Sequence, residues 1–134
     1  MLGNQIGEER GQVTTMRVLA EDGPLSRIEI SFQAQGRVLD CDVSEIGTYI
    51  STVRPDGTLF GEGQGLYMGT DGSAARWVGQ GSGRFTGPGR VSWRGSIHYS
   101  DGTAALASLS GTCALFEYEV DESGKTEARL FEWK

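Results

Sequence analysis

The chain has 134 residues, a mass of 14.4 kDa and a formal net charge of −6, from 18 acidic and 12 basic side chains. This length fits one folded domain and is too short for two. The acidic balance argues against a nucleic-acid partner and against an anionic membrane surface, because both require a basic face.

No apolar run approaches the ~20 residues that span a bilayer, and the first ten residues lack the basic and apolar parts of a signal peptide. We therefore expect a cytoplasmic protein. In that compartment Cys41 and Cys113, which have no CxxC spacing, are expected to be buried free thiols. One histidine and two separated cysteines cannot form a zinc site, so we expect no metal ion and no cofactor.

In chain order, residues 1–9 are polar and glycine-bearing, which predicts a flexible N-terminal segment before a single domain over 10–134. A strand is expected over Gln12–Ala20, ending at the turn Glu21-Asp22-Gly23-Pro24. Strict alternation from Ile28 to Gln35 predicts a half-buried strand. Gly36 then indicates a bulge or bend, which leaves open which face Asp40 and Asp42 occupy.

From Gly47 onward, strand-like runs alternate with turn sequences at a steady interval. The separators are Pro55-Asp56-Gly57, Thr70-Asp71-Gly72, Thr86-Gly87-Pro88-Gly89, Ser100-Asp101-Gly102 and Glu122-Ser123-Gly124-Lys125. Asp-Gly and Ser-Gly pairs favour two-residue hairpin turns. With no helical periodicity of useful length, the pattern predicts an all-β fold, an antiparallel up-and-down barrel of about eight strands.

Two segments of this meander carry glycine at every second residue. Gly61, Gly63 and Gly65 alternate in the first, and Gly79, Gly81 and Gly83 in the second. Glycine within a strand costs stability, so it usually marks strong curvature or the close approach of another group. Neither segment opens a helix, so neither is a phosphate-binding loop.

Two-residue loops at the Asp-Gly and Ser-Gly pairs give a testable register. This register places Glu62 opposite Ser51 and Gly81, and Gln64 opposite Tyr49 and Gly79. The expected interior face holds Val53, Phe60, Leu66, Met68, Trp77, Phe85, Val91, Trp93, Ile97, Tyr99, Leu106, Phe116, Phe131 and Trp133. The expected outer face holds Arg76, Gln80, Arg84, Arg94, Ser96, His98, Glu117 and Glu119. A one-residue change in the loop at Asp71-Gly72 would turn Trp77 and Phe85 to the other side.

Polar residues on the expected interior face define the candidate site. A carboxylate opposite glycine has space beside it, and burial would raise its pKa and suit it to acid–base chemistry. We therefore take Glu62 and Tyr49 as catalytic candidates; the alternative is that Glu62 is a hydrogen-bonded structural group. The ligand-binding candidates are Ser51, Phe60, Gln64, Leu66, Trp77, Gly79, Gly81, Trp93, Ile97, Ser108 and Ser110.

The stretches Tyr49–Gly57, Gly61–Gly65, Gly79–Phe85, Trp93–Ser96, Phe116–Val120 and Phe131–Lys134 resemble a group of small uncharacterised prokaryotic proteins. That group distantly resembles the allene-oxide-cyclase-like, calycin-type barrels. The resemblance implies an eight-stranded antiparallel barrel, often oligomeric, with an apolar cavity. It also implies that an interior glutamate and a tyrosine act on a bound lipid-like substrate without a cofactor, for which Glu62 and Tyr49 are the nearest candidates.

Three functions fit these observations. The first is a barrel that binds a small, mostly apolar molecule in its interior. The second is a cofactor-independent isomerase or cyclase in which an interior glutamate transfers a proton. The third is a filled barrel that acts through its outer surface or as a homo-oligomer.

Overall fold

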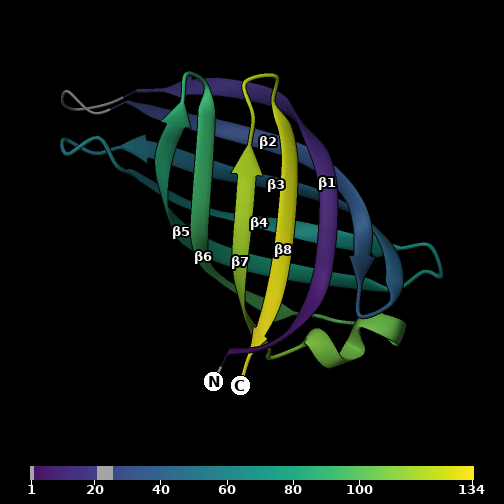
Figure 1. Cartoon of the computed structure of the whole chain (residues 1–134). Helices are drawn as coiled ribbons and strands as arrows, with labels where there is room; N and C mark the ends of the chain where they lie inside the picture. Colours follow the sequence, from purple (N-terminus) through teal and green to yellow (C-terminus); the bar gives the residue numbers. More distant parts are fainter. Residues whose placement is uncertain (1, 21–25) are drawn as a thin grey trace.

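The protein, seen here as a computed structural model that describes residues 2–20 and 26–134, is a closed eight-stranded antiparallel barrel (Figure 1). Each strand pairs with the next, and β1 pairs with β8. The elements are β1 (Leu2–Leu19), β2 (Arg27–Val38), β3 (Cys41–Val53), β4 (Leu59–Gly69), β5 (Ala74–Gly87), β6 (Arg90–Ser100), the 3-10 helix η1 (Ala104–Leu109), β7 (Cys113–Val120) and β8 (Lys125–Trp133). The predicted up-and-down barrel is confirmed. The turn predicted at 21–24 lies outside the described residues. Among the residues that the structure describes, no helix is long and apolar enough to cross a membrane.

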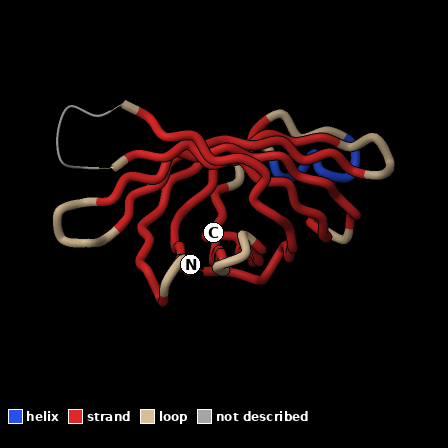
Figure 2. Tube along the Cα trace, turned by 90° about the horizontal axis from the view of Figure 1, so that it is seen from above, coloured by secondary structure: helices blue, strands red, loops and turns tan. Residues whose placement is uncertain are grey.

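The barrel is flattened, so that two groups of strands face each other. In Figure 1, β2, β3 and β4 run behind β6, β7 and β8 and cross them at a steep angle, and Figure 2 shows the same arrangement from above. Strands that pass between two such layers must bend. The long strand β1 does so with a bulge between Val13 and Thr15.

Residues 2–9, predicted as a flexible segment, belong to β1 from Leu2 onward. Gly7, Glu9 and Gly11 alternate along this part of the strand and pair with both β2 and β8. The polar composition misled the prediction, because Glu9 is a buried acid rather than a solvated one.

The bulge expected at Gly36 is also absent, since β2 and β3 pair without interruption from Arg27 to Cys41. Gly36 is needed for another reason: a side chain there would clash with the β1 backbone at Glu8. Leu39 and Asp40 form the two-residue turn, and both have positive φ. Cys41 is therefore buried, and Asp42 faces solvent.

Three hairpins have a different loop from the one predicted. The loops 55–57, 70–72 and 122–124 each contain three residues, and the last of them is a glycine with φ between 82° and 88°. At each loop an aspartate accepts hydrogen bonds from the backbone N–H and hydroxyl of the residue two positions later; Asp56 and Asp71 lie within their loops, and Asp121 directly precedes the third. These bonds lower the pKa of all three carboxyl groups. A three-residue loop shifts the register by one residue relative to a two-residue turn.

The shift exchanges the inward and outward faces of β4 and β8 relative to the prediction. Glu62 pairs with Ile50 and Gln80 rather than with Ser51 and Gly81. The residues predicted inside but found on the outward side of these strands are Phe60, Glu62, Gln64, Leu66, Met68, Phe131 and Trp133. Leu59, Tyr67 and Leu130 are buried instead. The predicted register of β5 and β6 is correct, and Phe85 pairs with Val91. Phe85 was also predicted to lie inside, but near the end of β5 it is 54% exposed.

The segment between β6 and β7 closes one end of the barrel. The predicted hairpin at Ser100-Asp101-Gly102 does not form; β6 pairs with Cys113–Val120 instead. Leu106 and Leu109 of η1 are 0% and 1% exposed and belong to the core, whereas Ser108 and Ser110 are exposed. Ser73 Oγ on the β4–β5 hairpin accepts the Ala105 N–H at 3.1 Å and so ties η1 to that hairpin.

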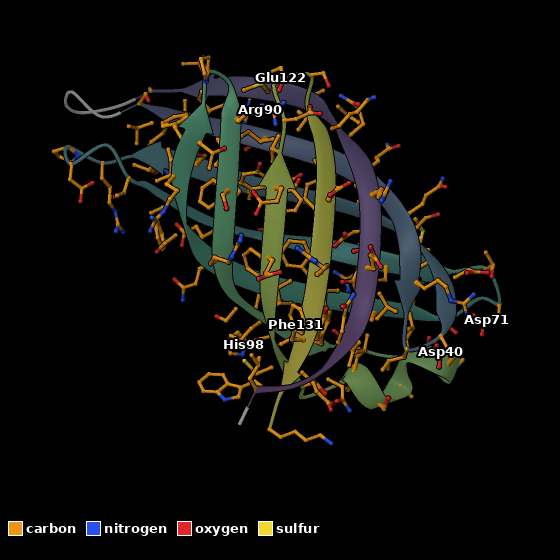
Figure 3. The ribbon with its side chains drawn as sticks, viewed as in Figure 1. Asp40, Asp71, Arg90, His98, Glu122 and Phe131 are labelled. Atoms are coloured by element: carbon orange, nitrogen blue, oxygen red, sulfur yellow. The ribbon has the colours of Figure 1, made fainter. Side chains whose placement is uncertain are left out.

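The two ends of the barrel can be followed in Figure 3. Asp40 and Asp71 mark the end that η1 closes, and Arg90 and Glu122 mark the opposite end. There an ion pair of 2.8 Å between Arg90 Nε and Glu122 Oε2 joins the β5–β6 and β7–β8 hairpins.

The interior glycines are contact sites for aromatic rings. A Cβ at Gly61 would lie 2.8 Å from the Trp93 ring, one at Gly83 would lie 2.7 Å from the same ring, and one at Gly81 would lie 2.9 Å from Phe116. A Cβ at Gly65 would overlap the Trp77 ring. The repeats therefore let large rings from one strand lie against the bare backbone of another.

We predict that Gly65→Ala destabilises the barrel by about 1 to 3 kcal/mol, because the Trp77 ring must move out of its packed position. Gly87→Ala is the matched control, since its Cβ would meet only the flexible Arg90 side chain at 3.4 Å. The control should change the free energy of unfolding by less than about 0.5 kcal/mol. Urea denaturation followed by tryptophan fluorescence measures both, and equal effects would contradict the ring-on-glycine contact.

Candidate functional site

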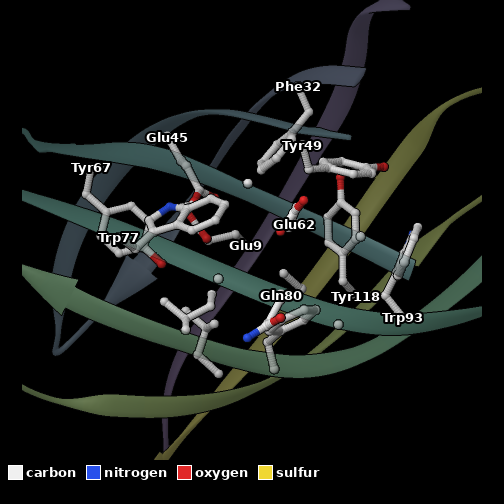
Figure 4. Close-up of a pocket in the computed structure, with 18 residues that line it drawn as sticks. Glu9, Phe32, Glu45, Tyr49, Glu62, Tyr67, Trp77, Gln80, Trp93 and Tyr118 are labelled. Carbon is white, nitrogen blue, oxygen red and sulfur yellow. Dashed lines mark hydrogen bonds between the residues drawn. The ribbon is translucent and has the colours of Figure 1, made fainter. Parts of the chain in front are cut away.

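A small cavity of about 80 Å³ lies in the barrel interior, between two clusters of buried side chains. One cluster reaches η1 and includes Leu106; the other contains Leu59, Trp93 and Tyr118. Figure 4 shows the cavity and the rings around it. The residues at its wall are Glu9, Phe32, Glu45, Tyr49, Gly61, Glu62, Gly63, Tyr67, Trp77, Gly79, Gln80, Gly81, Trp93, Ile97, Phe116, Tyr118, Ala128 and Leu130.

Two carboxyl groups meet at one end of this cavity. Glu9 on β1 and Glu45 on β3 are 3% and 5% exposed, and they hydrogen-bond each other. The strand between them, β2, places Gly36 opposite Glu9 and Ala34 opposite Glu45. The small residues at these two positions of β2 leave the room in which the two carboxyl groups meet.

Trp77 holds one member of this pair. Its Nε1–H donates a hydrogen bond of 2.6 Å to Glu45 Oε2, and Figure 4 shows both carboxyl groups beside the Trp77 ring. Burial raises the pKa of Glu9 to about 6. Burial and the negative charge of Glu9 raise the pKa of Glu45 well above its ordinary value. The two carboxyl groups therefore titrate as an interacting pair that holds its protons more tightly than exposed glutamates do.

Three tyrosines, on β3, β4 and β6, pack in the same core cluster as Trp77. The hydroxyls of Tyr67 and Tyr99 hydrogen-bond each other at 3.0 Å, and burial raises the pKa of both. Burial also raises the pKa of Tyr49 to about 12. Tyr49 packs edge-on against Trp93, with ring centroids 5.8 Å apart, and against Tyr118 at 6.1 Å.

Three buried polar atoms among the described residues lack a hydrogen-bond partner, and all three belong to residues at the cavity wall. They are Glu9 Oε1, Trp93 Nε1 and the Tyr118 hydroxyl. The Tyr118 hydroxyl lies near Tyr49 and Thr126, but no bond with either has good geometry. An unpartnered buried polar atom costs about 1 to 3 kcal/mol, so these atoms favour an occupant that supplies the missing bonds.

The structure brings together part of the predicted site. Tyr49, Trp77, Gly79, Gly81, Trp93 and Ile97 all line the cavity. Ser51 lies on the inward side of β3 but does not border the cavity. His98 is exposed on β6, opposite Val78, as predicted.

The other predicted site residues lie elsewhere. Glu62 borders the cavity on β4, but it alternates with Gly61 and Gly63 and is exposed. Gln64 and Leu66 are exposed on the same strand, and the Phe60 ring packs under the Arg54 guanidinium at 4.8 Å. Ser108 and Ser110 are exposed in and just after η1.

The sequence prediction missed the two buried acids. Glu45 shares its parity with Val43 and Tyr49 along β3, so extending the alternation back from Tyr49 would have placed it inside. Glu9 lies between Gly7 and Gly11 in an alternating pattern like that of the later glycine segments. That signal was present in a segment predicted to be flexible.

Solved structures share this fold. A conserved protein of unknown function from Rhodopseudomonas palustris matches with a TM-score of 0.80 at 11% identity, covering 98% of this chain and 97% of that one. A protein of unknown function from Clostridium acetobutylicum matches with a TM-score of 0.81 at 12% identity, covering 96% of both chains. An enzyme from Penicillium herquei matches with a TM-score of 0.65 at 14% identity, covering 98% of this chain and 96% of that one.

At these identities the likeness shows the fold alone. No family model and no curated protein sequence matches the chain. The predicted resemblance to uncharacterised small barrels agrees with the first two structures, and none of the three is described as an allene oxide cyclase.

The raised pKa of Glu9 predicts a pH dependence of stability. The folded barrel holds this proton more tightly than the unfolded chain, so the contribution is complete below pH 4.5 and is lost as the pH rises through about 6. Relative to a Glu9→Gln, Glu45→Gln double variant, the wild type should lose about 2 kcal/mol from Glu9 alone between pH 4.5 and 7.5.

Chemical denaturation at several pH values measures this difference. Glu8→Gln is the control, since Glu8 neighbours Glu9 on β1 but is exposed. A wild-type curve parallel to that of the double variant would show that the carboxyl pair does not hold an additional proton.

Proposed function

We propose that the barrel binds a small, mostly apolar molecule in its interior cavity. The observation that carries the proposal is the set of unpartnered polar atoms on Glu9, Trp93 and Tyr118, which border one aromatic cavity. Ligand sites commonly combine apolar walls with a few convergent polar groups. The orienting groups are thus Glu9, Trp93 and Tyr118, in place of Glu62 and Gln64.

The cavity size limits the ligand. About 80 Å³ holds a few water molecules, and an apolar cavity of about 150 Å³ holds benzene. A compact molecule of about six non-hydrogen atoms therefore fits with a small adjustment of the rings, whereas a long lipid chain does not. In the absence of a ligand, water suits the unpartnered atoms, and a ligand that replaces it must reproduce its hydrogen bonds.

The resemblance to allene-oxide-cyclase-like barrels supports this proposal because it implies an apolar cavity. It implied a lipid-like substrate, but the cavity favours a much smaller molecule. A saturated ring that carries one carbonyl oxygen matches the site, because Trp93 and Tyr118 offer donors and most of the remaining wall consists of aromatic rings, aliphatic side chains and glycine backbone.

We predict that cyclopentanone raises the melting temperature of the protein, because it binds the folded barrel alone. Methylcyclopentane, which lacks the oxygen, should bind about tenfold more weakly, since one hydrogen bond contributes about 1.4 kcal/mol. Trp93→Phe should remove this preference for the ketone. No stabilisation of the wild type by any compound of this size would contradict interior binding.

A second candidate function is self-association through the outer face of β3, β4 and β5. The register shift places apolar side chains side by side there: Ile46, Leu66, Met68 and Val78 are 44%, 39%, 47% and 58% exposed. Glu62 and Arg76 lie on the same face, so it carries both charge signs and can be complementary to a second copy of itself.

Leu66→Asp should therefore reduce self-association, because it introduces a charge at the centre of this face. Sedimentation velocity over a range of concentrations measures the effect, and Ser108→Asp, at an exposed position of η1 outside this face, is the control. A wild-type protein that remains monomeric at high concentration would remove this candidate.

A further inference from the structure

We propose that Glu9 is a general acid–base residue that moves a proton on a carbonyl compound bound in the cavity, and that Glu45 and Trp77 position it. This inference rests on the interior binding proposed above. It adds an activity, the isomerisation of a small unsaturated ketone.

The Glu9 carboxyl group belongs to the cavity wall. Glu9 Oε1 is buried and has no partner among the described residues, although Glu9 also hydrogen-bonds Glu45. Glu45 is held in turn by the Trp77 Nε1–H. The Trp77 ring packs on Gly65 and Gly47, so β1, β3, β4 and β5 together fix the position of the base. A base of fixed position beside an apolar cavity is suited to act on a bound molecule.

The proton transfer balances without a cofactor. The Glu9 carboxylate takes a proton from the carbon between a ketone carbonyl and a carbon–carbon double bond. The C–H electron pair becomes part of a dienolate, and Glu9 returns the same proton to the far carbon of the former double bond. The product is the conjugated isomer, and the carboxylate is regenerated.

The opposite side of the cavity supplies groups for the developing negative charge. The Trp93 Nε1–H and the Tyr118 O–H are buried donors with no acceptor of good geometry. Fixed donors in a site that excludes water stabilise an oxyanion strongly. No lysine, arginine or histidine is among the described residues at the cavity wall, so a carboxylate ligand would have no counter-charge there.

The ionisation state of the pair suits this role. With a pKa of about 6, Glu9 is largely ionised at neutral pH and still basic enough to accept a proton. The other titratable groups coupled to the pair are Tyr67, Tyr99 and Tyr118, whose pKa values are all raised by burial. They stay neutral through the same pH range, so the carboxyl pair alone titrates there.

The test uses cyclopent-3-en-1-one and follows its conversion to cyclopent-2-en-1-one by proton NMR. Wild type should accelerate the conversion, and Glu9→Gln should lose 10²- to 10⁴-fold in rate. Glu45→Gln should stay within about tenfold of wild type, because the amide can still accept from Trp77 and donate to Glu9. Glu8→Gln should match wild type.

Binding is measured separately with cyclopentanone, so that failure of the acid–base role can be distinguished from failure of interior binding. If cyclopentanone stabilises the wild type but no isomerisation is catalysed, the acid–base role is wrong and interior binding stands. If cyclopentanone does not bind, the proposed function fails and this inference fails with it. Glu9→Gln should still bind cyclopentanone, which shows that its loss of rate is not a loss of fold.

The pH profile of the wild type provides a readout that a structural role would not change. The rate should rise with pH and level off above about 6, as Glu9 ionises. A flat profile between pH 5 and 7.5, or an unchanged rate in Glu9→Gln, would overturn the proposal. Tighter binding of protonated cyclopentylamine than of cyclopentanone would also overturn it, because the carboxyl pair would then be a cation site.

Discussion

The contact between aromatic rings and interior glycines is the constraint on which this barrel depends. Trp77 lies against Gly65 and Gly47, and Trp93 lies against Gly61 and Gly83. Each ring fills space that a pair of ordinary side chains would occupy, so a few residues pack most of the interior. The cavity is the region between these rings, and its wall consists largely of ring faces and bare backbone.

The carboxyl pair is hard to explain by stability. Two buried acids that compete for one proton weaken the fold near neutral pH, and apolar residues of similar size would normally stabilise it more. The Trp77 Nε1–H donates a hydrogen bond to Glu45 Oε2, but Glu9 Oε1 has no hydrogen-bond partner among the described residues. Perturbed acids of this kind are concentrated at functional sites, which is why this end of the cavity is the stronger candidate for chemistry than exposed Glu62.

The barrel was predictable from the sequence because turn residues recur at a strand-length interval, and β5 and β6 were paired in the correct register. The number of residues in each loop was not predictable, since a glycine at positive φ occurs in both two-residue and three-residue hairpin loops. One extra loop residue on each side of β4 reversed the two faces of that strand while its neighbours stayed correct, so that Gly61 is buried inside the barrel and the Glu62 side chain is exposed. Glu9 and Glu45 become a pair only through the register of β2, which their own sequence neighbours do not determine.

Glu9 lies on β1, the strand whose pairing with β8 closes the barrel. The contact between Glu9 and Glu45 itself needs only β1, β2 and β3. Leu130 of β8 and Trp77 of β5 also line the cavity beside the two acids, so an open edge between β1 and β8 would expose the pair to water. Without burial, the upward shift in the pKa of Glu9 would be lost. The altered acidity of the pair is therefore a property of the closed barrel and not of its strands taken separately.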